Sequence, residues 1–234
     1  MGYTHYWDRQ ETINAKTFKK IVKDFEVLLP LLNAVGVKLA DGFGKGKAKI
    51  NNKELIFNGV EKCGHTKRDL GITFPSANAK GVGMVALKES DVKENKLEGI
   101  TNKDGQMMVL TGDPLEWVKN SDVSGSWFAG AKLDTRACSG DCSHETFYFP
   151  QADKNQDCQE RRGKHKLFFN CTKTAYKPYD LAVICALIIA KQHLGEKIKV
   201  GSDGDINQWA DGMAICEKIL GYGLAFSLDE GDEE

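Results

Sequence analysis

The sequence lacks the features that define several large classes of protein. Its 234 residues contain no run of 18 apolar residues, so we expect no membrane-spanning helix and no membrane partner. Lysine and arginine number 32 and aspartate and glutamate 33, which leaves a net charge of -1 and no overall basic field for nucleic acid. The opening MGYTHYW has no basic segment followed by an apolar core, so no secretory signal is predicted and a cytoplasmic location is expected.

The common catalytic signatures are missing as well. The chain has no Gly-x-Ser-x-Gly elbow, no His-Glu-x-x-His helix, no Gly-x-Gly-x-x-Gly fingerprint and no Cys-x-x-Cys pair. The glycine- and lysine-rich segment 42–47 lacks the spacing of a phosphate-binding P-loop, so it is interpreted as a hairpin loop. These absences exclude the easily recognised serine hydrolases, zinc proteases, dinucleotide oxidoreductases and dithiol redox proteins.

The residues that are present predict a globular α+β protein, with α/β as the alternative. Hydrophobic residues make up 41% of the chain and charged residues 28%, as in ordinary folded proteins. Apolar residues recur at helical spacing over 13–33 and 206–220, and segment 181–194 is apolar on nearly every face, which is typical of a buried helix. With short strands between these segments, we expect one mixed sheet packed by about three main helices.

The middle of the chain differs from its two ends. Residues 61–137 are rich in glycine, lysine, aspartate and asparagine and show little helical periodicity. Short apolar runs at 82–87, 106–110 and 126–129 predict strands, and we expect them to form a small sheet of their own. The prediction is a single domain over 1–228 with a peripheral insertion at about 61–137. The acidic residues 229–234 are expected to be a disordered tail.

The first candidate site lies between an apolar strand and the buried helix. Lys173, Thr174, Lys177, Tyr179 and Asp180 occupy this connection. Backbone N–H groups at a helix N-terminus and two lysine side chains favour negative charge, so the segment predicts an anion-binding site. The alternative is a structural strand-to-helix turn in which Tyr179 or Asp180 caps the helix.

The second candidate site also joins a strand to a helix. It contains Ser202, Asp203 and Asp205, and carboxylates such as these could hold a divalent metal ion. If the strands before the two loops are parallel neighbours, both loops meet at one edge of the sheet, where ligands of open sheets bind. The alternative is that an aspartate here caps the helix and that Asp203 with its following glycine forms a turn.

A third candidate is the histidine in the first strand. On an extended strand, Tyr3, His5 and Trp7 share one face, and Tyr6 lies on the other. His5 could act as a general acid or base because histidine titrates near neutral pH. The alternative for His5 is an ordinary hydrogen-bonded residue.

Cysteine and histidine residues flank the middle segment. The set comprises Cys63, His65, Cys138, Cys142 and His144, and residues of these two types are the usual ligands of structural zinc. A zinc ion held by this set would join the two ends of the insertion. Neither half has a spacing that identifies a known zinc motif, so a disulfide between Cys138 and Cys142 and unpaired thiols stay as alternatives.

Several segments resemble a protein family of microbes and viruses to which no activity is attached. They are MGYTHYW at the start, Asn58 with Gly59, His144 to Phe147, TKTAYKPYD over 172–180, and VGSDG over 200–204 followed by Trp209. The likeness covers about 1–60 and 144–228 and leaves 61–137 uncovered. It implies that the two ends form one module and that the chain is of microbial or phage origin, and it assigns no catalytic residue.

Two functions follow as hypotheses, and whether the chain is an enzyme stays open at this point. In the first, Lys173 and Lys177 bind the phosphate of a nucleotide or another small molecule, Asp203 and Asp205 hold a metal ion, and His5 moves protons during hydrolysis. In the second, the same loops form a non-catalytic binding or interaction module. The implied cofactor is a divalent metal ion or a structural zinc, and the charge balance leaves nucleic acid undecided as a partner.

Overall fold

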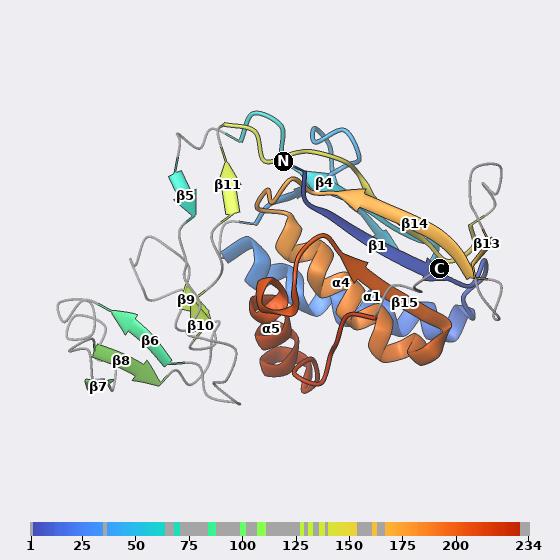
Figure 1. Cartoon of the computed structure of the whole chain (residues 1–234). Coiled ribbons are helices and arrows are strands. Elements are labelled where there is room, and N and C mark those ends of the chain that lie inside the picture. The colour runs from blue at the N-terminus through green and yellow to red at the C-terminus, as the bar shows by residue number, and fades with distance from the viewer. Residues whose placement is uncertain are drawn as a thin grey trace.

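The computed structural model describes residues 2–34, 37–63, 140–153 and 167–229, together with short strands between 68 and 138 and the pair 161–162. Its main helices are α1 (Ala15–Ala34), α4 (Asp180–Leu194) and α5 (Ala210–Leu220). The 3-10 turns η2 (Gly195–Lys197) and η3 (Ile206–Trp209) follow α4 and precede α5. The predicted α+β class is confirmed (Figure 1). In the described part of the chain, none of the helices has the length and apolarity that crossing a membrane requires.

The first sheet has the order β13 (Arg161–Arg162), β14 (Leu167–Lys173), β1 (Thr4–Arg9), β15 (Ile198–Ser202). Both β14 and β15 pair antiparallel with β1, so they run parallel to each other with β1 between them. The two strands are therefore parallel, as the meeting of the two loops required, but they are not neighbours. The loops that leave β14 and β15 still meet at one edge of the sheet, and the start of β1 joins them there.

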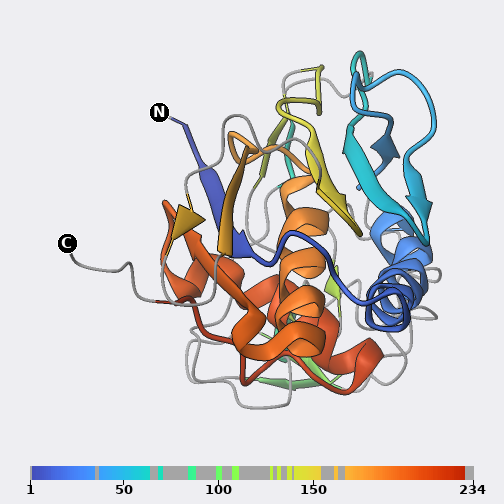
Figure 2. The same cartoon turned by 90° about the vertical axis from the view of Figure 1, so that its right-hand side faces the viewer.

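A second sheet contains β12 (Phe147–Pro150), β4 (Glu54–Gly59) and β2 (Leu39–Ala40), with β3 (Lys49–Asn51) also paired to β4. The single mixed sheet that we expected is thus divided in two, and the pairings described in both sheets are antiparallel. Figure 2 shows α4 at the centre, with β1 and β14 on one side and β4 and β12 on the other.

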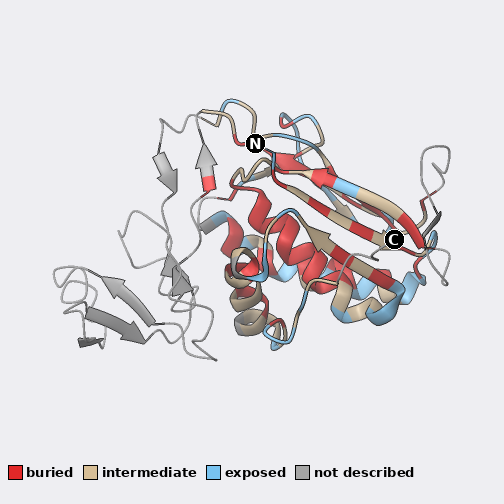
Figure 3. Ribbon diagram, viewed as in Figure 1, coloured by how far each residue is buried: buried red, intermediate tan, exposed pale blue. Residues whose placement is uncertain are grey.

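Helix α4 forms the centre of the core. Every residue from Asp180 to Ala190 is buried, because α1, α5 and the first sheet surround the helix (Figure 3). Aromatic side chains fill the space between the second sheet, β1 and α1, and Trp7 and Phe147 lie 5.2 Å apart between ring centres. The apolar composition of segment 181–194 therefore correctly predicted a helix covered on all sides.

Helix α1 begins and ends close to the expected positions. The side-chain oxygen of Asn14 accepts a hydrogen bond of 2.9 Å from the backbone N–H of Lys16 and so caps the first turn. Pro30 lies inside the helix on its exposed face, and the helix continues past it to Ala34.

The described residues in the middle of the chain form seven short strands: β5 (Arg68–Leu70), β6 (Met84–Leu87), β7 (Gly99–Thr101), β8 (Met107–Leu110), β9 (Trp127–Phe128), β10 (Ala131–Lys132) and β11 (Arg136–Cys138). Strands β6 and β8 lie at the predicted apolar runs 82–87 and 106–110 and pair into a separate sheet, whose third strand β7 was not predicted. The run at 126–129 forms β9, which pairs with β10 instead. The rest of segment 61–137 lies largely outside the described residues, as does the tail from residue 230 onward. One side chain of this segment, Arg136, is buried in the core.

Candidate functional site

The register of the first sheet places His5 between two hydroxyl side chains. His5 lies directly opposite Thr172 on β14 and directly opposite Ser202 on β15. Residues opposite one another share a face of the sheet, and this face is the one covered by α4. The alternating burial of β1 confirms the prediction that His5 and Trp7 lie on the same side.

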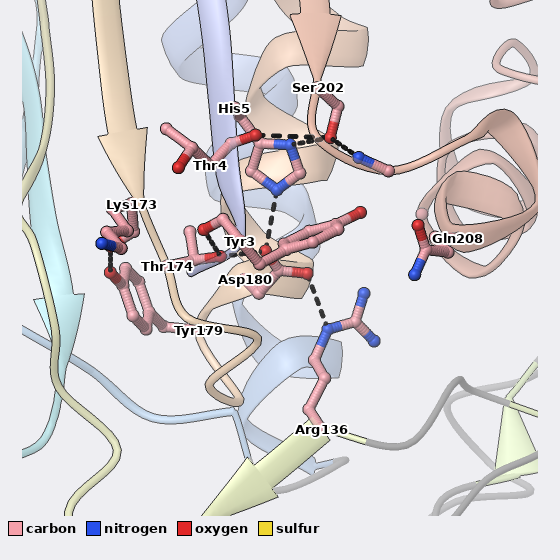
Figure 4. Close-up of polar contacts among 12 residues, drawn as sticks. Tyr3, Thr4, His5, Arg136, Lys173, Thr174, Tyr179, Asp180, Ser202 and Gln208 are labelled. Atoms are coloured by element: carbon pink, nitrogen blue, oxygen red, sulfur yellow. Dashed lines mark hydrogen bonds and ion pairs between the residues drawn. The ribbon is translucent and has the colours of Figure 1, made fainter. Parts of the chain in front are cut away.

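One chain of hydrogen bonds passes through both ring nitrogens of His5. Its Nε2 lies 2.7 Å from Oδ1 of Asp180, and its Nδ1 lies 3.1 Å from Oγ of Ser202 (Figure 4). The side chains of His5 and Asp180 are both 0% exposed. An ionised Asp180 only accepts hydrogen bonds, so the network assigns the proton of a neutral imidazole to Nε2. Nδ1 is then free to accept the hydroxyl proton of Ser202.

Three side chains hold the carboxylate of Asp180. Oδ1 accepts hydrogen bonds from His5 and from the hydroxyl of Thr174, and Oδ2 accepts one of 3.0 Å from Nε of Arg136. Burial by itself raises the pKa of Asp180, but the contacts with His5, Arg136 and Thr174 outweigh it and lower that pKa below its usual value. Asp180 therefore stays ionised at neutral pH.

Arg136 links Asp180 to a second buried carboxylate. Its Nη1 and Nη2 bind the two oxygens of Asp211 in α5, with 3.2 Å between Nη2 and Oδ1. The sequence analysis missed both residues. The only signal for Asp211 was its spacing of four from buried Ile215 on the helix, and nothing near Arg136 in the sequence indicates where it lies.

The turn between β14 and α4 has an unusual backbone. Ala175 and Tyr176 both adopt left-handed conformations, with φ of 50° and 56°, which non-glycine residues rarely populate. The turn places the ring of Tyr176 4.6 Å from that of Tyr3 and under the guanidinium of Arg136 at 5.4 Å. Consecutive strained residues beside a buried polar cluster are typical of functional sites.

The backbone groups that were expected to bind an anion have other partners. The N–H groups of Thr174 and Ala175 both donate to the carbonyl of Tyr3, at 2.8 and 3.1 Å. Tyr179 is buried at the N-cap position of α4, and its hydroxyl donates to the carbonyl of Glu145 at 2.6 Å. Because the Asp180 carboxylate occupies the first turn of α4, the geometry matches the structural alternative more closely than an anion site.

The two lysines do not join His5. Lys177 donates from Nζ to the backbone carbonyl of Asp141 at 2.8 Å. Lys173 lies opposite Thr4 in the register, so it belongs to the face of the sheet away from His5. The predicted site is therefore separated, with Thr174, Asp180 and Ser202 in the buried cluster and both lysines outside it.

The two aspartates of the second loop are exposed. The carboxylate of Asp203 accepts a hydrogen bond from the hydroxyl of Tyr6, and the backbone N–H of Asp205 donates to Oε1 of Gln208 at 3.1 Å. Within the described ranges, three or more histidine, cysteine, aspartate or glutamate side chains nowhere gather closely enough to hold a metal ion. Among these described residues, Asp203 and Asp205 therefore have no third histidine, cysteine, aspartate or glutamate close enough to complete the expected metal site.

The expected zinc ligands are only partly described. His65 and the side chain of Cys138 lie outside the described residues, Cys63 is partly buried and Cys142 is buried. His144 is exposed, and its Nδ1 lies 2.8 Å from the backbone carbonyl of Lys173. That contact uses one of the two ring nitrogens of His144, and the zinc set stays a prediction.

The described residues form an α+β protein in which partly buried Ser202 and fully buried His5 and Asp180 make one hydrogen-bonded chain near an end of the first sheet. Comparison of the chain with protein-family models, with curated proteins and with solved structures found no match. Any function must therefore be argued from the site itself.

Proposed function

We propose that the protein is a serine-dependent hydrolase of uncharged carboxylic esters. The observation that carries the proposal is the continuous hydrogen-bonded chain from the Ser202 hydroxyl through His5 to Asp180. A nucleophile bound to a base, and a base oriented by a third group, is the arrangement by which a serine hydroxyl becomes reactive. Here the nucleophile approaches Nδ1 of the histidine and the carboxylate binds Nε2.

The chemistry balances with these three residues and water. Ser202 Oγ attacks the carbonyl carbon of the ester while its proton moves to Nδ1 of His5, and that proton passes to the alcohol oxygen as the carbon–oxygen bond breaks. Water then attacks the acyl-serine, gives its proton to His5, and the proton returns to Ser202 as the carboxylic acid leaves. Asp180 stays ionised throughout and stabilises the imidazolium formed in each half-reaction.

The local charge favours an uncharged substrate. The charged side chains of the cluster and its two loops include four carboxylates, those of Asp180, Asp203, Asp205 and Asp211, and three cations, those of Arg136, Lys173 and Lys177. Two further carboxylates lie beside the lysines. Glu145 accepts a hydrogen bond from the backbone N–H of Lys173, and hydrogen bonds from Ser143 together with the nearby charge of Lys177 lower the pKa of Asp141. A phosphate dianion would be repelled by the excess of negative charge, whereas a neutral ester would not.

The phosphate-directed hypothesis stays as a second proposal. It is supported by the meeting of the loops after β14 and β15 at one edge of the sheet, which brings Lys173 and Asp203 to the same end. It requires a divalent metal ion or a nucleotide to balance the carboxylates there. The interaction-module alternative requires no reaction at Ser202.

Covalent labelling of Ser202 tests the proposal. A fluorophosphonate probe forms a bond from phosphorus to an activated serine oxygen and releases fluoride, and peptide mass spectrometry identifies the labelled residue. We expect label on Ser202 and none in Ser202→Ala. Ser143→Ala is the matched control, because the hydroxyl of Ser143 bonds to the Asp141 carboxylate without a histidine.

Label on Ser202 that is retained in Ser143→Ala would support the hydrolase. Equal labelling of Ser143 and Ser202, or no label at millimolar probe, would overturn it and favour the interaction module.

A further inference from the structure

The hydroxyl of Tyr3 is a buried polar group without a hydrogen-bond partner. Tyr3 is 9% exposed, and its hydroxyl oxygen has no partner within 3.5 Å at hydrogen-bond geometry, although the side chain of Ser202 lies near enough to act on the pKa of the phenol. An unsatisfied buried hydroxyl is unfavourable in the folded state, so such groups call for an explanation. A ligand that accepts a hydrogen bond from this hydroxyl provides one.

The phenol is held in a fixed position. The backbone carbonyl of Tyr3 accepts hydrogen bonds from the N–H groups of Thr174 and Ala175, which anchor the start of β1. The ring packs edge-on against His5, with 5.0 Å between ring centres, and against Tyr176. Figure 4 shows the Tyr3 ring between His5 and Arg136, with its hydroxyl directed toward Gln208.

The hydroxyl lies beside the loop that carries the nucleophile. A Cβ atom built on Gly204 would come within 2.5 Å of the Tyr3 hydroxyl oxygen and within 2.0 Å of Oε1 of Gln208. Glycine at position 204 therefore allows the phenol to approach the backbone two residues after Ser202. A larger residue there would displace the hydroxyl.

The backbone donors of the same loop already have acceptors. The N–H of Asp203 donates to the carbonyl of Thr4 at 2.9 Å, and that of Gly204 donates to Oγ of Ser202 at 3.1 Å. The N–H of Asp205 binds Gln208. Acyl transfer needs a donor for the charge that develops on the carbonyl oxygen, and backbone N–H groups usually supply it. Because the N–H groups of this loop are already bonded, a side chain would have to donate the hydrogen bond to the oxyanion.

We propose that the Tyr3 hydroxyl donates a hydrogen bond to the carbonyl oxygen of the ester and to the oxyanion formed when Ser202 attacks it. The inference rests on the proposed function. Burial, together with the nearby charge of Asp180, raises the pKa of Tyr3 above its usual value, so the phenol keeps its proton and can donate. The substrate class that follows has an uncharged carbonyl oxygen at the reacting centre.

Kinetic measurements on variants test the role in catalysis. With 4-nitrophenyl acetate, Tyr3→Phe is expected to lower the rate of Ser202 acetylation about 100- to 1,000-fold, the loss typical of one oxyanion donor. With the thionoester analogue, in which sulfur replaces the carbonyl oxygen, the same substitution should change the rate much less. The matched control Tyr6→Phe removes a hydroxyl on the opposite face of β1 and should leave both rates unchanged.

A binding measurement decides the inference even if the hydrolase proposal fails. In Ser202→Ala with 13Cζ-labelled tyrosine, methyl acetate serves as an unreactive carbonyl probe, and Tyr3→Phe identifies the Tyr3 signal. A saturable shift of that signal supports the donor role, whether or not Ser202 is ever acylated. No saturable shift, or equal loss of rate with ester and thionoester, would overturn it.

Discussion

Within the described residues, two histidine–aspartate pairs have the same separation but lie in very different surroundings. His5 and Asp180 are 2.7 Å apart and fully buried, whereas His193 at the end of α4 and Asp24 of α1 are 2.7 Å apart with 18% and 25% of their side chains exposed. In the buried pair, the second ring nitrogen of His5 is hydrogen-bonded to Ser202. In the outer pair, the hydroxyl of Tyr222 donates a hydrogen bond of 2.6 Å to the Asp24 carboxylate.

The difference shows that a short distance between a histidine and a carboxylate does not by itself identify a candidate catalytic site. In the outer cluster the hydroxyl donates to the carboxylate, so no nucleophile is coupled to His193 in the arrangement described. In the inner cluster the hydroxyl of Ser202 is hydrogen-bonded to the imidazole of His5, and the buried guanidinium of Arg136 binds the Asp180 carboxylate. The outer pair joins α1 to α4 and the segment after α5, which is a structural task.

The largest effect is expected when Arg136 is removed. Arg136→Met leaves Asp180 and Asp211 buried without their shared cation, and breaking a buried ion pair costs about 3–5 kcal/mol. The free energy of unfolding from urea titration measures the loss. A loss below about 1 kcal/mol would show that the charges of the cluster are solvated, so that the buried cluster would not differ energetically from the partly exposed His193–Asp24 pair.

The next prediction concerns acid. Because the pKa of Asp180 in the folded protein lies below its unfolded value of about 3.9, the unfolded state binds more protons between the two values. The stabilisation from Asp180 is therefore present above about pH 4 and is lost as the pH falls further. Asp180→Asn should lower stability at neutral pH and flatten its decline below about pH 4. An unchanged slope in urea titrations across this range would contradict the ionised, paired state of Asp180.

A smaller effect is expected at the outer pair. Asp24→Asn weakens a partly exposed contact, and such pairs contribute about 0–1 kcal/mol. The loss in free energy of unfolding should stay near or below 1 kcal/mol, several-fold less than for Arg136→Met. Equal losses in the two variants would mean that burial does not distinguish the clusters.

The smallest effect is expected at the surface. Lys45 lies 3.4 Å from Glu61, with 71% of its side chain exposed. Lys45→Ala should change the free energy of unfolding by less than about 0.5 kcal/mol. A loss above 1 kcal/mol would indicate that this loop makes contacts beyond the exposed ion pair.

Local patterns predicted the elements better than they predicted the site. Alternation in the first strand correctly placed His5 and Trp7 on one face. Apolar periodicity located α1 and α5, and the all-round apolarity of 181–194 located α4. The loops after β14 and β15 were expected at one edge and lie there. The insertion of β1 between these strands was not predicted, because strand order depends on long-range pairing.

The residues that complete the cluster could not be found from the sequence. Arg136 binds partners 44 and 75 positions away in the chain, and it comes from a segment that the lack of periodicity marked as peripheral. Charge patterns on neighbouring residues indicate helices and surfaces, but they do not show which distant carboxylate a lone arginine meets. The two lysines were expected to join the site because they lie near the end of a strand, but sequence position did not show that Lys173 faces away from His5 or that Lys177 binds the carbonyl of Asp141.

The most direct test of the central claim compares the two histidines as bases. The rate constant for fluorophosphonate labelling of Ser202 is measured in His5→Gln and in His193→Gln, with the free energy of unfolding determined on the same samples. We expect His5→Gln to lower the rate at least about 100-fold, as for loss of a general base, and His193→Gln to leave it within about twofold. Equal rates in folded samples of both variants would contradict the account.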